Sequence, residues 1–143
     1  MKQKEKEIIK HMRTGKRLNI SKIAREMGLP ISTVNDAIKR IEKRYVIKRS
    51  SLLDYHKLGY LANAKLAIRV NSNDKKDFLD FLKEDRRINS ISYVNSGFDF
   101  MVDIVCRDAI ELKNWMNTVR RDFSLEIIVF QILGTEAVER WVP

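Results

Sequence analysis

The sequence predicts an α+β protein, in which an N-terminal winged helix-turn-helix at residues 1–54 is followed by a linker at 55–59 and a ferredoxin-like βαββαβ domain at 60–143. Three observations predict this architecture. Positive charge is concentrated in the first third of the chain. The same third has the apolar spacing of three short helices. After it, strands and helices follow one another in the order of a ferredoxin-like domain.

Charge divides the chain sharply. Residues 1–54 contain 15 Lys and Arg against 6 Asp and Glu, whereas residues 55–143 contain 13 of each sign. The whole formal net charge of +9 therefore comes from the first segment. A basic module joined to a neutral one indicates that the first module binds a polyanion. The alternative is a solvated, lysine-rich surface, which does not explain the split.

Three short helices are predicted in the first segment. The first covers residues 4–14, where apolar residues recur on one side. Asn19 is a suitable N-cap for the second, which Gly28 can end. The third begins somewhere between Pro30, which a first turn tolerates, and Ser32, which is a good N-cap. The sequence leaves that choice open.

The second and third helices, joined by Gly-Leu-Pro, form a helix-turn-helix. The basic stretch that follows, VIKRSSLLD, is predicted to be a strand that forms a wing. One flank of the third helix is apolar and carries Val34, Ile38, Ile41 and Tyr45. The opposite flank carries Ser32, Asp36, Lys39 and Lys43. Such a helix is either an ordinary amphipathic surface helix or one that lies in a DNA groove.

Residues 60–143 alternate between strands and helices. From Tyr60 every second residue is apolar, which predicts a half-buried strand, and a helix with an apolar stripe follows at 74–85. Two strands, NSISYVN and FDFMVDIVC, are joined by a Ser-Gly turn. Asp108 and Glu111 resemble a capping box that opens the next helix, and the last strand is EIIVFQIL. Both helices would cover one sheet face, and a second copy of the chain is the economical cover for the other.

Composition argues against several classes of protein. No apolar run is long enough to span a membrane, and the charged N-terminus is not followed by an apolar signal core, so we expect a cytoplasmic protein without a membrane partner. The single cysteine, Cys106, lies in an apolar strand, where we expect a buried and inert thiol. His11 and His56 are too far apart in sequence to suggest a catalytic pair. We therefore expect no metal, no cofactor and no enzymatic activity.

Three sequence motifs follow one another along the chain. These are ISKIAREMGLPISTVNDAIKRIEKRYVIKR, then SLLDYHKLGY, then FDFMVDIVCRD. They resemble, in turn, the helix-turn-helix, the linker, and the strand and helix start after the effector loop of the Lrp/AsnC (feast/famine) family of bacterial and archaeal transcription regulators. The resemblance covers nearly the whole chain. It implies a module that binds double-stranded DNA, and a C-terminal domain that forms homodimers through its sheet, which often assemble further into tetramers or octamers.

The resemblance also implies an effector or dimer–dimer contact at a loop before the third strand. This loop consists of Asn95, Ser96, Gly97, Phe98 and Asp99. Many family members bind an amino acid there, and Asp99 would bind its amino group, although a plain turn residue explains Asp99 equally well. The family usually has its glycine one position earlier, where this chain has Ser96. Because the added side chain should reshape the site, we expect weak or no response to ordinary amino acids and a loop that acts mainly between dimers.

The third helix and the wing carry the candidate DNA contacts. These are Ser32, Thr33, Asn35, Asp36, Lys39, Arg40, Lys43, Lys48 and Arg49. The first three are positioned for base edges or phosphates, with helix capping as the alternative. The five cations would bind phosphates, although a solvated face is also possible for those of the helix.

Two residues of the third helix depart from the family pattern. Asp36 occupies a place where the family often has arginine. We favour an ion pair with Lys39 or Arg40 one turn away, and the alternative is a hydrogen bond accepted from a cytosine amino group. Tyr45 stands where the family tends to have glycine. Because tyrosine disfavours positive φ, we expect a different exit from the helix.

Two other classes of function remain as alternatives. Some tetrapyrrole-pathway decarboxylases resemble this regulator family, but they would need cations and a histidine or tyrosine in a central cavity. The other alternative is a protein-interaction module, in which the helix-turn-helix contacts a protein instead of DNA. Weak, salt-insensitive DNA binding would favour the latter.

Overall fold

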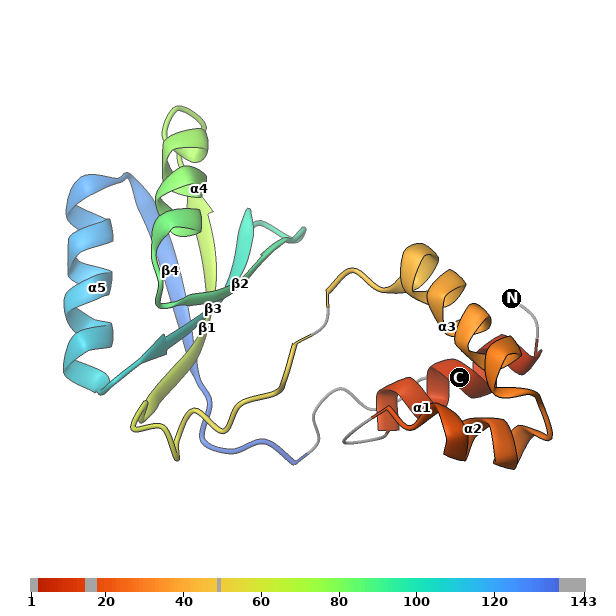
Figure 1. Cartoon of the computed structure of the whole chain (residues 1–143). Coiled ribbons are helices and arrows are strands. Elements are labelled where there is room, and N and C mark those ends of the chain that lie inside the picture. The colour runs from red at the N-terminus through yellow and green to blue at the C-terminus, as the bar shows by residue number, and fades with distance from the viewer. Residues whose placement is uncertain (1–2, 15–17, 49, 137–143) are drawn as a thin grey trace. The chain divides into compact units, whose positions relative to one another are not determined.

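The computed structural model describes residues 3–14, 18–48 and 50–136, which divide into two compact units. The helical unit lies within residues 1–52, and the sheet unit runs from Leu53 to Thr135 (Figure 1). Across these described ranges, no helix is both long enough and apolar enough to cross a membrane.

Three helices make up the helical unit: α1 (Gln3–Thr14), α2 (Ile20–Met27) and α3 (Ile31–Tyr45). Each has an apolar side, as predicted, and the three apolar sides meet in one core. That core consists of Ile8, Ile23, Ala24, Val34, Ala37, Ile38 and Ile41. The burial of these residues determines which side of each helix is left to face water.

A tight turn joins α2 to α3. Asn19 caps α2 as predicted, because its Oδ1 accepts a hydrogen bond of 3.0 Å from the Lys22 N–H. Gly28 ends α2 with a left-handed φ of 62°, a conformation that glycine adopts without steric penalty. Pro30 is the N-cap of α3, so the helix takes the earlier of the two predicted starts and Ser32 lies inside it.

The predicted wing strand is absent from the described residues. Residues 46–48 and 50–54 adopt no strand, and Arg49 lies outside the part that the structure describes. A strand needs a partner for its backbone groups, and none of the described residues of the helical unit forms one. The exit from α3 is extended at Val46, with φ −93° and ψ 114°, so Tyr45 is not followed by a left-handed residue, as predicted.

The sheet unit has the predicted βαββαβ order. Its elements are β1 (Ala62–Val70), α4 (Lys75–Glu84), β2 (Ile88–Tyr93), β3 (Phe100–Cys106), α5 (Ala109–Asp122) and β4 (Leu125–Gln131). The strands lie in the order β2-β3-β1-β4, and each neighbouring pair is antiparallel. The ferredoxin-like prediction is therefore confirmed.

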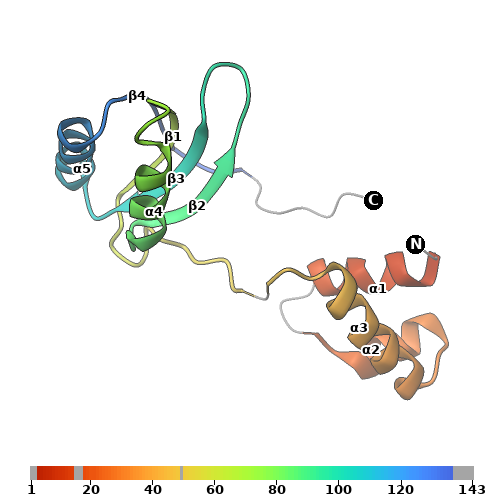
Figure 2. The same cartoon turned by 90° about the horizontal axis from the view of Figure 1, so that it is seen from above.

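Both helices cover one face of this sheet, as Figures 1 and 2 show from two directions. Alternate residues of the strands point to that face, which places Leu66 and Phe100 among the fully buried side chains. Phe78 of α4 packs against Phe100, with 6.2 Å between the ring centroids. Trp115 of α5 is buried in the same core, where it acts as a packing residue.

The N-terminus of α5 is capped almost as predicted. The Asp108 Oδ1 accepts a hydrogen bond of 2.8 Å from the Glu111 N–H. The Glu111 carboxylate accepts one of 2.6 Å from the N–H of Arg107, one residue before the expected donor. The cap is therefore a capping box whose return bond is displaced by one residue.

The opposite face of the sheet, which we call the outer face, is covered by none of the described helices. Ile128 and Phe130 of β4 are 40% and 52% exposed there. Asp103, also on this face, accepts hydrogen bonds from Lys65 Nζ at 2.5 Å and from the Ser90 hydroxyl at 2.6 Å. The outer face thus combines a satisfied polar network with exposed apolar residues.

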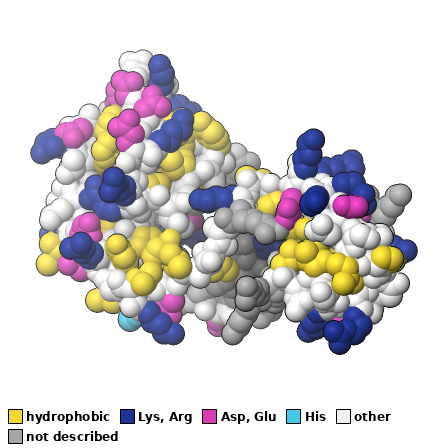
Figure 3. Space-filling model, viewed as in Figure 1, with side chains coloured by type: hydrophobic (Ala, Val, Ile, Leu, Met, Phe, Trp, Pro, Cys, Tyr) yellow, Lys and Arg dark blue, Asp and Glu magenta, His cyan; other side chains and the backbone are white. Residues whose placement is uncertain are grey.

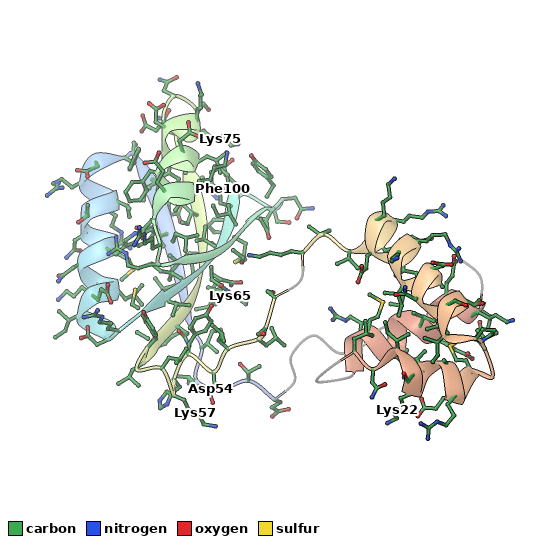
Figure 4. All side chains as sticks on the ribbon, viewed as in Figure 1. Lys22, Asp54, Lys57, Lys65, Lys75 and Phe100 are labelled. Atoms are coloured by element: carbon green, nitrogen blue, oxygen red, sulfur yellow. The ribbon has the colours of Figure 1, made fainter. Side chains whose placement is uncertain are left out.

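The predicted linker forms a hydrogen-bonded turn. The Asp54 Oδ1 accepts a bond of 3.2 Å from the Lys57 N–H, and the Tyr60 N–H donates to the Tyr55 carbonyl at 2.9 Å (Figure 4). The Tyr55 hydroxyl also donates to Asn89 of β2 at 3.2 Å. The first two bonds close the turn, and the third attaches it to β2.

Candidate nucleic-acid interface

One continuous side of α3 faces water. Val34, Ile38 and Ile41 are buried on the other side, and helical geometry turns the intervening residues outward. The exposed side carries Ser32, Thr33, Asp36, Lys39, Arg40 and Lys43. In Figure 3, Lys and Arg side chains gather over this helix. We call this side the α3 face.

The first turn of α3 has no side-chain cap. The side chain of Pro30 has no group that could accept a hydrogen bond, and neither Ser32 nor Thr33 supplies a cap. Both hydroxyls are exposed, while Asn35 is half-buried. The alternative, in which these side chains cap the N-terminus of α3, is therefore not observed. Uncapped N–H groups and the positive end of the helix dipole favour an anion at this position.

Three cations occupy the rest of the α3 face. Lys39, Arg40 and Lys43 are all exposed, and the side chain of each is without an ion pair to any described residue. Because none of the three pairs with a described carboxylate, they add positive potential to this side of the helix.

We predicted an ion pair between Asp36 and Lys39 or Arg40, and this prediction was wrong. Its carboxylate is exposed and forms no ion pair with Lys39, Arg40 or any other described residue. Pairs of this kind at a surface gain only tenths of a kcal/mol while two side chains lose freedom, so water competes successfully for the carboxylate. Asp36 therefore presents free acceptor oxygens on the α3 face.

Of the two cations predicted for the wing, the structure describes only Lys48. Lys48 is exposed. Arg49 lies outside the residues that the structure describes. Among described residues, the α3 face thus carries the larger part of the candidate site.

The loop Asn95–Asp99 is held within the sheet unit. The Asp99 Oδ1 accepts a hydrogen bond of 2.6 Å from Lys75 Nζ, and its Oδ2 accepts one of 2.8 Å from the Val70 N–H. The Lys75 ammonium, followed by the Val70 N–H, lowers the pKa of Asp99. The two carboxylate oxygens that could have received an effector's amino group are therefore already engaged by the chain itself.

Arg69 holds the tip of the same loop. Its Nε donates to the Gly97 carbonyl, and its guanidinium lies over the Phe98 ring, 5.4 Å from the centroid. Ser96 has a φ of 65° and Gly97 a φ of 92°, so the displaced glycine leaves a serine in the left-handed region. The left-handed φ of Gly97 favours glycine there, and an added Cβ would also lie 3.0 Å from Arg69 Nη2, so that the arginine side chain would have to shift.

Lys75 and Arg69 were missed as members of this loop's surroundings. Lys75 is the first residue of α4 and Arg69 lies near the end of β1. Antiparallel pairing of β1 with β3 brings both regions beside the loop, and only the chain topology, which periodicity does not reveal, predicts that meeting. Figure 4 labels Lys75 at the start of its helix. Within the described ranges, no group of three or more acidic, His or Cys side chains is arranged to hold a metal ion.

No family model matches the chain. Curated proteins do match, and two of them serve as examples. An uncharacterised HTH-type transcriptional regulator of Pyrococcus furiosus is 25% identical over 113 residues, which cover 78% of this chain and 76% of the relative. The HTH-type transcriptional regulator FL11 of Pyrococcus horikoshii is 23% identical over 116 residues, covering 80% of this chain and 77% of FL11.

Solved structures give a closer likeness in fold. B. subtilis LrpC superposes with a TM-score of 0.84 at 17% identity, over 96% of this chain and 97% of LrpC. E. coli AsnC gives 0.85 at 14% identity, over 99% and 97%. A Neisseria meningitidis regulator solved with L-Met, NMB0573, gives 0.89 at 11% identity, over 100% and 96%. The chain thus has the fold of the Lrp/AsnC regulators, and the predicted resemblance is confirmed.

Proposed function

We propose that this chain, with its Lrp/AsnC fold, is a transcriptional regulator that binds double-stranded DNA through the α3 face. The observation that carries the proposal is the exposed row of cations on α3, none of them neutralised by a described carboxylate. They lie in the segment that supplies the whole net charge of +9. The curated relatives are named HTH-type transcriptional regulators, which supports the same function.

The α3 face suits the major groove of DNA. A recognition helix lies in that groove with its N-terminal residues toward the base edges. Ser32, Thr33 and Asn35 occupy that end of α3. The longer Lys39, Arg40 and Lys43 then reach the phosphates, which gives affinity without sequence preference. Lys48 and Arg49, which follow α3, are assigned to phosphates as well.

The outer face of the sheet is the proposed dimer interface. Ile128 and Phe130 expose apolar side chains to water, and a second copy of the chain would cover them. A two-fold dimer presents two α3 faces, so its operator should hold two similar inverted half-sites about one helical turn, roughly 10 base pairs, apart. Assembly of these dimers into tetramers or octamers is proposed to use the loop Asn95–Asp99.

We propose a weak or absent response to free amino acids. The NMB0573 regulator was solved as a complex with L-Met, so a protein with this fold can bind a free amino acid. Here Lys75 and Val70 already engage both oxygens of Asp99, and Arg69 engages the loop backbone. An incoming amino group would have to displace Lys75, which is tethered and therefore present at high effective concentration.

The enzyme alternative gains no support from the comparisons, since the relatives are transcription regulators. The proposed regulator would act where chromosomal DNA lies, which places it in the cytoplasm of a bacterial or archaeal cell.

Selection of bound sequences from random duplex DNA tests the proposal. We expect enrichment of paired inverted half-sites, and the same sequences when each amino acid is added in turn. Recovery of unenriched DNA after repeated rounds, with weak binding that salt does not change, would instead favour the protein-interaction alternative.

A further inference from the structure

Asp36 lies in the middle of the α3 face. Ser32, Asp36, Lys39 and Lys43 follow one another at intervals of four, three and four residues, so they form one row along the helix. The buried residues Val34, Ile38 and Ile41 lie on the opposite side. When α3 enters a groove with this row inward, Asp36 is on the line that faces the groove floor.

A carboxylate at that position needs a donor. The two cations one turn away do not pair with Asp36, and it has no other partner among the described residues. Phosphates repel it, and loss of water in the groove leaves its acceptor oxygens unsatisfied. Binding therefore disfavours Asp36 unless the DNA itself supplies a hydrogen-bond donor.

The length of the side chain decides which part of the DNA it reaches. Aspartate is short, so from the central row it extends toward base edges, whereas lysine and arginine can extend sideways to the phosphate walls. In the major groove the amino groups of cytosine (N4) and adenine (N6) are donors. Adenine also presents the N7 acceptor beside its amino group, which opposes a carboxylate, whereas cytosine presents no acceptor at that edge.

We propose that Asp36 accepts a hydrogen bond from the N4 amino group of a cytosine, and so sets the base preference at one position of each half-site. The inference rests on the proposed function, because it needs α3 to lie in the major groove. It gives the only acidic residue of the exposed row a role that the cations cannot perform.

Exchange of the carboxylate for a carboxamide is the sharpest test. Asn can accept from the adenine N6 amino group and donate to N7 at the same time. Sequence selection with the full-length Asp36→Asn variant should therefore move the preference at one half-site position from cytosine to adenine. Asp36→Ala should lose about tenfold of the preference for cytosine at that position, with other positions unchanged.

The matched control is Asp77→Asn, which removes an exposed carboxylate from α4 in the sheet unit. It should leave every base preference as in the unaltered chain. If the Asp36 variants bind with unaltered base preferences, or bind all duplexes more tightly by the same factor, Asp36 only repels phosphates and the inference is overturned, while DNA binding stands. If the unaltered chain binds no duplex, the proposed function fails, and this inference fails with it.

Discussion

Lys75 and Asp99 form an ion pair, with 2.6 Å between Lys75 Nζ and Asp99 Oδ1, that joins the start of α4 to the end of the loop before β3. The second carboxylate oxygen accepts the Val70 N–H at the end of β1, and the Asp99 N–H donates to the Ile68 carbonyl at 2.8 Å. Asp99, which immediately precedes β3, is thus bonded to both β1 and α4. The family resemblance marks this loop as an effector site. In this chain, the hydrogen bonds of Asp99 attach the loop to β1 and α4.

Removal of this carboxylate should destabilise the sheet unit. Asp99→Ala leaves the Val70 N–H without its acceptor, and we expect it to lower the free energy of unfolding by about 1–3 kcal/mol. Asp99→Asn should lower it less, because a carboxamide oxygen can still accept from Val70. Urea denaturation measures the difference, with Asp77→Ala as the exposed control. Equal stability of Asp99→Ala and the control would show that the hydrogen bonds of the Asp99 carboxylate do not stabilise the sheet unit.

The same pair predicts a pH dependence. Lys75 lowers the pKa of Asp99 in the folded chain below its ordinary value of 3.8. The folded state therefore binds fewer protons at this site than the unfolded state, and the contribution to stability is complete above 3.8 and is lost as pH falls through the lower, folded value. The stability difference between the unaltered chain and Asp99→Asn should be constant near neutral pH and shrink in acid. A difference that grows on acidification would contradict the assignment.

The outer face of the sheet predicts a dimer. Phe130→Glu would place a charge where a second copy should pack, and we expect it to convert the protein to monomers at micromolar concentration. Multi-angle light scattering measures the mass directly. Ile110→Glu is the matched control, because Ile110 is 70% exposed on α5 and should not affect association. A monomeric mass for the unaltered chain would refute the interface.

Cys106 should be unreactive in the folded chain. Its side chain is fully buried in β3, and burial raises the pKa of its thiol to about 11. The thiolate that attacks disulfide reagents is therefore scarce at neutral pH. We expect modification by an aromatic disulfide reagent only after denaturation, at a rate set by unfolding. Rapid modification of the native protein would contradict the burial.

The helices of both units and the four strands of the sheet were predictable because their apolar residues recur at helical or strand spacing, whereas the predicted wing strand does not form in the described residues. Asn19, Gly28 and Asp108 marked helix ends for local reasons, since each bonds to or bends its own segment. Tyr45 similarly predicted that the helix would not end as in the family, and the structure shows an extended exit at Val46.

What the sequence missed depends on distant partners. Lys75 meets Asp99 only after the sheet has formed, and Trp115 Nε1 likewise donates to Asp85 Oδ2 at 2.8 Å, although the two are far apart in the chain. The prediction for Asp36 was wrong for the opposite reason, because it depended on a local contact. A possible local ion pair was assumed to form, but at an exposed site its free energy is too small to hold two side chains together.

The salt dependence of duplex binding tests the central claim most directly. The logarithm of the association constant should fall linearly with the logarithm of salt concentration, with a slope of about −0.9 for each phosphate neutralised. Replacement of Lys39, Arg40 and Lys43 by Ala should weaken binding to all duplexes alike and flatten that slope, whereas replacement of the exposed Lys76, Lys113 and Arg120 of the sheet unit should leave it unchanged. An unchanged slope in the first variant would show that the α3 face does not bind DNA.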